Sequence, residues 1–220
     1  MTANARVLTV AIDLPDVRLP GDLNLPPRAH GLVVFVHGSG SSRHSSRNRF
    51  VASSLVDRGF ATLLFDLLTE AEDRDYETRF DIPLLTRRLL GVSAWLRGQP
   101  TLNSLPLGYF GASTGAAAAL NAAAEPKSGV AAVVSRGGRP DLALDSLPQV
   151  AAPTLLIVGG ADEEVIRLNQ QAYAALRCPK ELAIVAGATH LFEEPGTLEE
   201  VSVLAGEWFE RHCAGTAAPA

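Results

Sequence analysis

Five consecutive residues near the middle of the chain have the spacing of a serine nucleophile presented on a tight turn. Gly111-Ala112-Ser113-Thr114-Gly115 fits the pattern G-x-S-x-G. The apolar run 105–110 precedes it and the alanine-rich run 116–120 follows, which is the strand–turn–helix context that this motif requires. The turn needs positions without bulk on either side of the serine, and glycine supplies them. The pattern predicts that Ser113 is a nucleophile; the alternative is an ordinary turn of small residues.

A serine hydroxyl is a weak nucleophile near neutral pH, so it needs a base, and the base needs an acid that orients it. Asp162 and His190 follow Ser113 in the order acid, then base, that is usual for this motif. Each comes just after a predicted strand, residues 154–158 and 181–185, so each should lie at the strand ends where the serine lies. We predict that His190 is the base and that Asp162 orients it.

Both partners have structural alternatives. Asp162 could instead cap the helix predicted to begin near Glu163. A histidine in a loop is often simply exposed to solvent. Asp141 and Asp145 also lie between the serine and the histidine, although neither directly follows a predicted strand.

Acyl transfer also needs backbone N–H groups aimed at the developing negative charge, the oxyanion hole. We expect one from Thr114 and one from Ser39, in the loop after the predicted strand 32–36; Gly38 and Gly40 are alternatives for the second. A glycine- and serine-rich loop could also bind phosphate. This loop lacks the third glycine of G-x-G-x-x-G and the Gly-Lys-Ser/Thr of a P-loop, which argues against nucleotide binding.

Arginines near the same edge could bind an anionic group of a substrate through paired hydrogen bonds. Arg43 and Arg136 are the first candidates, and Phe192 is a candidate for lining the pocket. Further basic residues nearby are His44, Arg47, Arg49 and Arg139. The alternatives are structural: the arginines could pair with acidic residues, and Phe192 could belong to the core. The acidic residues in question are Asp66, Asp141 and Glu193.

Short apolar strands alternate with amphipathic helices along the chain, which predicts an α/β fold with a mostly parallel central sheet and helices on both faces. The expected strands are 7–12, 18–25, 32–36, 60–65, 105–110, 130–135, 154–158 and 181–185. The expected helices are 49–58, 81–96, 113–124, 163–176 and 197–211. The first two strands could form an antiparallel hairpin. The charged stretch 69–79 is expected to be a solvated loop with room for a helical turn, and no segment is long enough for a separate lid domain.

Composition narrows the class of protein. The 220 residues are 47% hydrophobic and 20% charged, as in globular domains. A net charge of −5 gives nucleic acid no general attraction. With two cysteines, no signal peptide and no membrane-length apolar run, we expect a soluble cytoplasmic protein. Residues 1–213 should form one domain and 214–220 a disordered tail; no pattern indicates the oligomeric state.

With these motifs, the chain resembles the dienelactone hydrolase-like branch of the α/β-hydrolases, most clearly over residues 32–209. The segments that carry the resemblance are HGSGSSRHSSRNR (37–49), LLFDLLT (63–69), GYFGASTGAAAAL (108–120), VVSRGGRPDLA (133–143), TLLIVGGAD (154–162) and ATHLFEEPG (188–196). It is similar to a subgroup of small, lidless hydrolases also found fused to phosphoribosyltransferase domains, and no such domain is expected here. The resemblance implies hydrolysis of carboxylic esters or lactones without a metal or cofactor; the nearby arginines add the possibility of an anionic substrate.

One departure from the family bears on the substrate. True dienelactone hydrolases carry a cysteine nucleophile at the elbow, where this chain has Ser113. Cys178 and Cys213 do not follow a strand in an elbow and cannot replace it. Serine favours ordinary esterase chemistry through an acyl-enzyme. A peptidase or acyltransferase using the same three residues, and a non-catalytic binding domain, are the alternatives.

Overall fold

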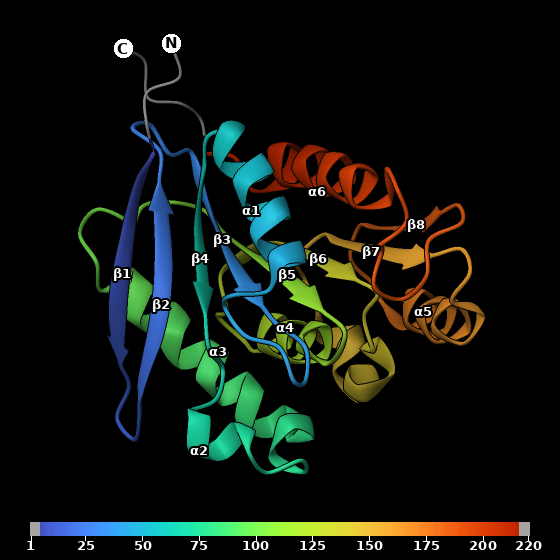
Figure 1. The fold of residues 1–220 in the computed structure, drawn as a ribbon, viewed down its shortest axis with the longest axis horizontal. Coiled ribbons are helices and arrows are strands. Elements are labelled where there is room, and N and C mark those ends of the chain that lie inside the picture. The colour runs from blue at the N-terminus through green and yellow to red at the C-terminus, as the bar shows by residue number, and fades with distance from the viewer. Residues whose placement is uncertain (1–4, 216–220) are drawn as a thin grey trace.

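The computed structural model describes residues 5–215, in which eight strands form one sheet (Figure 1). The strands are β1 (Arg6–Asp13), β2 (Arg18–Leu25), β3 (Gly31–Val36), β4 (Phe60–Phe65), β5 (Leu107–Ala112), β6 (Val130–Arg136), β7 (Thr154–Gly159) and β8 (Lys180–Val185). Their order is β1-β2-β4-β3-β5-β6-β7-β8. Only β2 runs against its neighbours; β4, β3 and β5 to β8 pair in parallel. The predicted mostly parallel sheet and its opening hairpin are confirmed.

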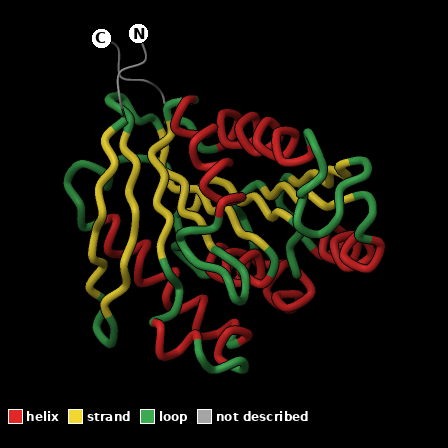
Figure 2. Tube along the Cα trace, in the orientation of Figure 1, coloured by secondary structure: helices red, strands yellow, loops and turns green. Residues whose placement is uncertain are grey.

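Helices cover both faces of the sheet (Figures 1 and 2). The helices are α1 (Ser46–Asp57), α2 (Glu70–Asp73), α3 (Ile82–Arg97), α4 (Thr114–Ala124), α5 (Glu163–Ala175) and α6 (Thr197–His212), with 3₁₀ segments η1 (Thr78–Phe80) and η2 (Pro140–Gln149). One core packs α3, α4 and α5 against the sheet, and a second packs α1 and α6 against the other face. Because both faces are covered, β3, β4, β5 and β7 are buried along their whole length.

Two elements differ from the sequence-based expectation. Helix α1 begins at Ser46, three residues before the predicted start, because the Ser45 side chain accepts the amide hydrogen of Asn48 at 3.3 Å and caps the helix. The segment η2 lies between the expected strands 130–135 and 154–158, where no helix was expected, and it forms 3₁₀ turns; Pro148 inside it could not lie in an α-helix without loss of a hydrogen bond.

The charged stretch 69–79 contains the short helical turn that was anticipated. In α2, Thr69 and Glu72 form a reciprocal capping box: the Glu72 amide donates to Thr69 Oγ1 at 3.2 Å, and the Thr69 amide donates to Glu72 Oε2 at 2.8 Å. Arg79 closes the stretch by donating to the Asp73 carbonyl at 2.7 Å. These contacts hold the stretch beside the loop that follows β3, since a Cβ added at Gly40 would meet Arg79 Nη1 at 3.7 Å.

The predicted tail falls largely outside the described residues. Of its residues, Ala214 and Gly215 are described, and the Gly215 amide donates to the His30 carbonyl at 2.7 Å. Across residues 5–215, no helix is both long and apolar enough to cross a membrane.

Candidate active site

The parallel strands bring the predicted site residues to one edge of the sheet. Ser113 follows β5, Asp162 lies three residues beyond β7, and His190 lies five residues beyond β8. The loop with Ser39 follows β3, which pairs directly with β5. The carboxyl ends of parallel strands meet at a common edge, where open α/β sheets bind their ligands.

The turn at Ser113 is strained, as the motif predicted. Ser113 has φ 51° and ψ −124°, a backbone conformation that side-chain-bearing residues rarely adopt. A Cβ on Gly115 would overlap the carbonyl oxygen of Val36, and a Cβ on Gly111 would lie 2.5 Å from the Cα of Ala116. Strain of this kind is kept where the surrounding structure enforces it, often at functional sites. An ordinary turn of small residues does not need this conformation, so the geometry favours a nucleophile turn at Ser113 over that alternative.

Asp162 and His190 are joined side chain to side chain. Asp162 Oδ2 accepts a hydrogen bond from His190 Nδ1 at 2.7 Å. Asp162 occupies the residue before α5, yet its side chain makes no capping hydrogen bond, so the helix-cap alternative is not realised. Asp141 is engaged elsewhere, with Arg139 at 2.9 and 2.8 Å. With Nδ1 donating to the carboxylate, Nε2 of His190 is left with its lone pair free to accept a proton.

Hydrogen bonds within the loop that carries His190, and to the Asp162 loop, hold it in place. Thr189 donates to Glu194 twice, from its amide at 3.1 Å and from its hydroxyl at 2.7 Å. These bonds favour the charged carboxylate and lower the pKa of Glu194. Phe192 sits in the left-handed region at φ 56° and is 1% exposed. The Ala161 amide donates to the Ala188 carbonyl at 2.9 Å, which ties the Asp162 loop to the His190 loop.

Residues 136–139, which run from the last residue of β6 into the following loop, connect the serine to the histidine. The Ser113 amide donates to the Arg136 carbonyl at 3.3 Å, and the Arg139 amide donates to the Ser113 carbonyl at 3.0 Å. A Cβ on Gly137 would lie 3.7 Å from Cε1 of His190. Within residues 5–215, no hydrogen bond joins the Ser113 hydroxyl to His190. Catalytic hydrogen bonds are often long without substrate and shorten when it binds.

The loop after β3 lies against the nucleophile. A Cβ on Gly38 would lie 2.9 Å from Cβ of Ser113. Buried His37 fixes the loop: its Nδ1 donates to the Gly38 carbonyl at 2.9 Å and its Nε2 accepts from the Leu67 amide at 3.0 Å. Burial lowers the pKa of His37, which keeps the ring neutral in the tautomer that these bonds require. No role for His37 was predicted from the sequence; a histidine directly after a buried strand was the available signal.

The Ser39 amide, predicted as an oxyanion donor, already has a partner. It donates to Thr114 Oγ1 at 2.9 Å across 75 residues of sequence. The other predicted donor, the Thr114 amide, lies in the first turn of α4, where amides have no partner inside the helix. The structure therefore brings both predicted residues together, and the Thr114 hydroxyl joins them, a contact that was not predicted.

Most of the candidate arginines are paired with acidic residues. Arg43 forms an ion pair with Asp66, and its Nε lies 3.6 Å from Asp22, which favours the structural alternative for Arg43. Arg47 pairs with Glu193 at 3.1 Å, and Arg139 pairs with Asp141 as described above.

Arg136 differs from these arginines. It is 6% exposed, and among the described residues its recorded hydrogen bond is from Nη2 to Asn48 Oδ1 at 3.2 Å, while its Nε is buried without a partner. Its guanidinium carbon lies 5.7 Å from the centre of the Phe192 ring, which places Phe192 in the core beneath the site. Burial and the nearby charge of Arg47 lower the pKa of Arg136 to about 10, so it stays charged at neutral pH.

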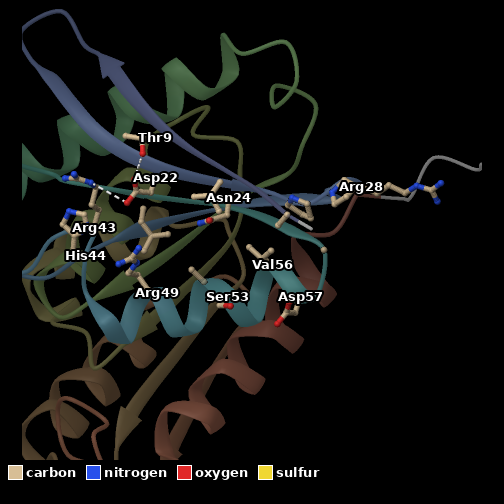
Figure 3. Close-up of a pocket in the computed structure, with 17 residues that line it drawn as sticks. Thr9, Asp22, Asn24, Arg28, Arg43, His44, Arg49, Ser53, Val56 and Asp57 are labelled. Atoms are coloured by element: carbon tan, nitrogen blue, oxygen red, sulfur yellow. Dashed lines mark hydrogen bonds and ion pairs between the residues drawn. The ribbon is translucent and has the colours of Figure 1, made fainter. Parts of the chain in front are cut away.

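A groove of about 940 Å³ lies between the β1–β2 hairpin and α1, away from Ser113, Asp162 and His190 (Figure 3). Asp22 inside it accepts from Thr9 at 3.4 Å and faces Arg43. Among residues 5–215, neither Thr9 nor Ser53, the hydroxyl side chains that line the groove, hydrogen-bonds to a histidine, so its size alone does not make the groove the candidate reactive site. Across residues 5–215, no three His, Cys, Asp or Glu side chains gather as metal ligands would.

The sheet with its strained Ser113 turn, and the acid and histidine at neighbouring strand ends, define the chain as an α/β-hydrolase. The chain belongs to the dienelactone hydrolase family, whose profile matches residues 21–208. The resemblance seen in the sequence is therefore confirmed.

Solved structures show the same fold. The chain is similar to a dienelactone hydrolase from Anabaena variabilis, with 52% identity and a TM-score of 0.93 over 96% of this chain and 100% of that one. It also superimposes on Est1E from Butyrivibrio proteoclasticus, with 16% identity and a TM-score of 0.77 over 92% of this chain and 98% of that one. The second similarity is one of fold alone.

Two curated relatives from Mycobacterium tuberculosis strains bear the name "Putative phosphoribosyl transferase". Each is 61% identical to this chain over 199 residues. The match covers 90% of this chain and 45% of the relative. The chain thus spans somewhat less than half the length of the curated relatives that it matches.

Proposed function

We propose that the protein is a serine hydrolase that cleaves small carboxylic esters or lactones through an acyl-enzyme. The observation that carries the proposal is the 2.7 Å hydrogen bond between Asp162 and His190, at the same sheet edge as the strained Ser113. A binding domain has no need of a nucleophile, a base and an oriented acid together. Membership of the dienelactone hydrolase family supports the same class of reaction.

In the first half of the reaction, Ser113 Oγ attacks the ester carbonyl carbon and His190 Nε2 takes its proton. The carboxylate of Asp162 holds the ring and stabilises its charged form. The Thr114 amide, together with a second donor where the elbow meets the loop after β3, stabilises the oxyanion of the tetrahedral intermediate. When the intermediate collapses, the bond to the alcohol oxygen breaks and His190 gives the proton to the leaving alcohol.

Water then hydrolyses the acyl-enzyme, again with His190 as the base. His190 removes a proton from the water as its oxygen attacks the acyl carbon. The second tetrahedral intermediate then releases the carboxylic acid, and Ser113 recovers its proton from His190.

The buried positive charge of Arg136 is evidence that the substrate is anionic. A buried charge without a counter-ion costs several kcal/mol, so it is unusual unless a ligand supplies the opposite charge. The acidic partner of the nearby Arg47, Glu193, lies in the His190 loop and is itself exposed, so it does not neutralise Arg136. The fold neighbour Est1E was solved with ferulic acid bound, which shows that this fold accommodates a small organic acid in that protein. We assign Arg136 to a carboxylate or similar anionic group on the ester.

Replacing Arg136 with methionine should therefore reduce selectivity for an anionic ester. A charge-assisted hydrogen bond contributes about 1.5–3 kcal/mol, so the ratio of kcat/KM for a succinate p-nitrophenyl monoester over p-nitrophenyl acetate should fall at least about tenfold. Arg49→Met is the control, because exposed Arg49 lies on α1 in the groove of Figure 3, and its ratio should stay at the wild-type value. An unchanged ratio in Arg136→Met would mean that Arg136 serves the fold alone.

The direct test of the proposed function is labelling with a fluorophosphonate, which traps an activated serine. Peptide mass spectrometry should find the adduct on Ser113, and the folded wild-type protein should hydrolyse members of a panel of p-nitrophenyl esters and lactones. A peptide p-nitroanilide and an amine acceptor in the same panel test the peptidase and acyltransferase alternatives. Folded protein that takes no label and hydrolyses nothing would favour a binding role.

A further inference from the structure

The peptide between Gly38 and Ser39 is held at both of its polar ends. His37 Nδ1 donates to its carbonyl at 2.9 Å, and its amide donates to Thr114 Oγ1 at 2.9 Å. His37 is fixed in turn by the Leu67 amide at 3.0 Å. The peptide cannot turn its N–H toward another acceptor without breaking bonds that are already made.

The hydroxyl of Thr114 lies at the centre of this contact. Thr114 is 3% exposed and directly follows the nucleophile. The next residue packs so closely that a Cβ on Gly115 would overlap the carbonyl oxygens of Val36 and His37. A Cβ on Gly38 would lie 3.7 Å from Ser113 Oγ, so the loop, the nucleophile and the Thr114 hydroxyl share one small region.

A hydroxyl can accept and donate at the same time. Thr114 Oγ1 accepts from Ser39, and across residues 5–215 no acceptor is recorded for its own hydrogen. Accepting a hydrogen bond polarises an O–H group and makes it a stronger donor. The buried hydroxyl thus has a spare, activated hydrogen one residue from the reacting serine.

We infer that the Thr114 hydroxyl is itself a donor to the oxyanion, and that Ser39 acts through it. The chain of hydrogen bonds runs from the Ser39 amide to Thr114 Oγ1 and from the Thr114 hydroxyl to the oxyanion. Thr114 then contributes two donors, its amide and its hydroxyl. No proton is transferred, because both hydrogens stay on Thr114 while the charge on the substrate oxygen forms and disappears. This inference rests on the proposed ester hydrolysis and replaces the Ser39 amide as the direct second donor.

Two variants of Thr114, compared with the wild type, test the inference. Thr114→Ser keeps the hydroxyl, and Thr114→Val keeps the shape of the side chain without the hydroxyl. Loss of one oxyanion donor typically lowers kcat by about 10²–10³-fold, so Thr114→Val should lose that much with KM within about threefold. Thr114→Ser should restore most of the activity. Circular dichroism and Tm establish that each variant is folded.

A second measurement reports on the donor itself. Each variant is assayed with a p-nitrophenyl ester and with its thiono analogue, in which the carbonyl oxygen is replaced by sulfur, a poor hydrogen-bond acceptor. The preference for oxygen over sulfur should be strong in the wild type, kept in Thr114→Ser and sharply reduced in Thr114→Val.

Three results would overturn the inference. Equal or higher kcat in Thr114→Val would mean that the hydroxyl blocks the Ser39 amide, which is then the direct donor. Equal losses in both variants would show that the hydroxyl is not what matters. A lower kcat with an unchanged oxygen-over-sulfur preference would make Thr114 a positioning residue. Fluorophosphonate labelling of wild-type Ser113 separates these results from failure of the proposed function, because a protein that is labelled and active upholds that function whatever Thr114 does.

Discussion

Replacing Ser113 with alanine is expected to lower kcat for ester hydrolysis by about 10⁴- to 10⁶-fold. The variant keeps the oxyanion donors and the binding surface but lacks the atom that forms the acyl-enzyme. Removing Oγ should not disturb the fold, because Ser113 contributes its hydroxyl to no helix cap. Initial rates on the most reactive p-nitrophenyl ester measure the loss, and Ser104→Ala, at an exposed serine before β5, is the matched control.

The activity lost in the Ser113→Ala and His190→Ala variants, alone and combined, shows whether the two residues act in one mechanism or contribute separately. His190→Ala should lose nearly as much activity as Ser113→Ala, because His190 carries every proton transfer of the reaction: from the serine, to the leaving alcohol and from the water. The double variant should then be scarcely worse than either single variant, as expected for residues that act as a unit. Losses that multiply, or activity that survives Ser113→Ala, would show that Ser113 is not the nucleophile.

The fold, and the position of Ser113, Asp162 and His190 at one edge of the sheet, could be predicted because their signals are local. Buried parallel strands read as unbroken apolar runs, so the ends of β5 and β7 were visible to within about two residues. The edge strand β8 is only partly buried, but its apolar residues 182–185 marked its end. Once those ends were known, chain order selected Asp162 and His190. The glycines at 111 and 115 had a steric reason that the structure bears out.

Contacts between distant segments could not be predicted in the same way. The Ser39–Thr114 hydrogen bond depends on β3 lying beside β5, and strand order is not encoded in the pattern of any one strand. The link from Arg136 to Asn48 spans 88 residues and depends on α1 beginning at Ser46. Whether an arginine is paired or left without a counter-ion is likewise decided by tertiary structure, which is why Arg43 and Arg136 could not be told apart in the sequence.

Asp162→Asn tests whether the acid works by its charge, and kcat should fall by about 10³–10⁴-fold. The amide has nearly the shape of the carboxylate, so His190 should keep its place. An NH₂ group facing Nδ1 would force the proton onto Nε2, the atom that must take the serine proton, and the charged ring would lose its counter-ion. Fluorophosphonate labelling of Ser113 should slow in parallel, since it needs the same base.

Asp141→Asn is the matched control for Asp162→Asn, because Asp141 also lies between the serine and the histidine in sequence but pairs with Arg139. Its kcat should stay within about threefold of the wild type, in the range expected when a part-exposed ion pair is lost. If instead Asp141→Asn lost activity and Asp162→Asn did not, the acid would be Asp141, and the 2.7 Å contact at His190 would be structural. Because both variants make the same chemical change, a difference between them can come only from position, which makes the pair a test of the site's geometry.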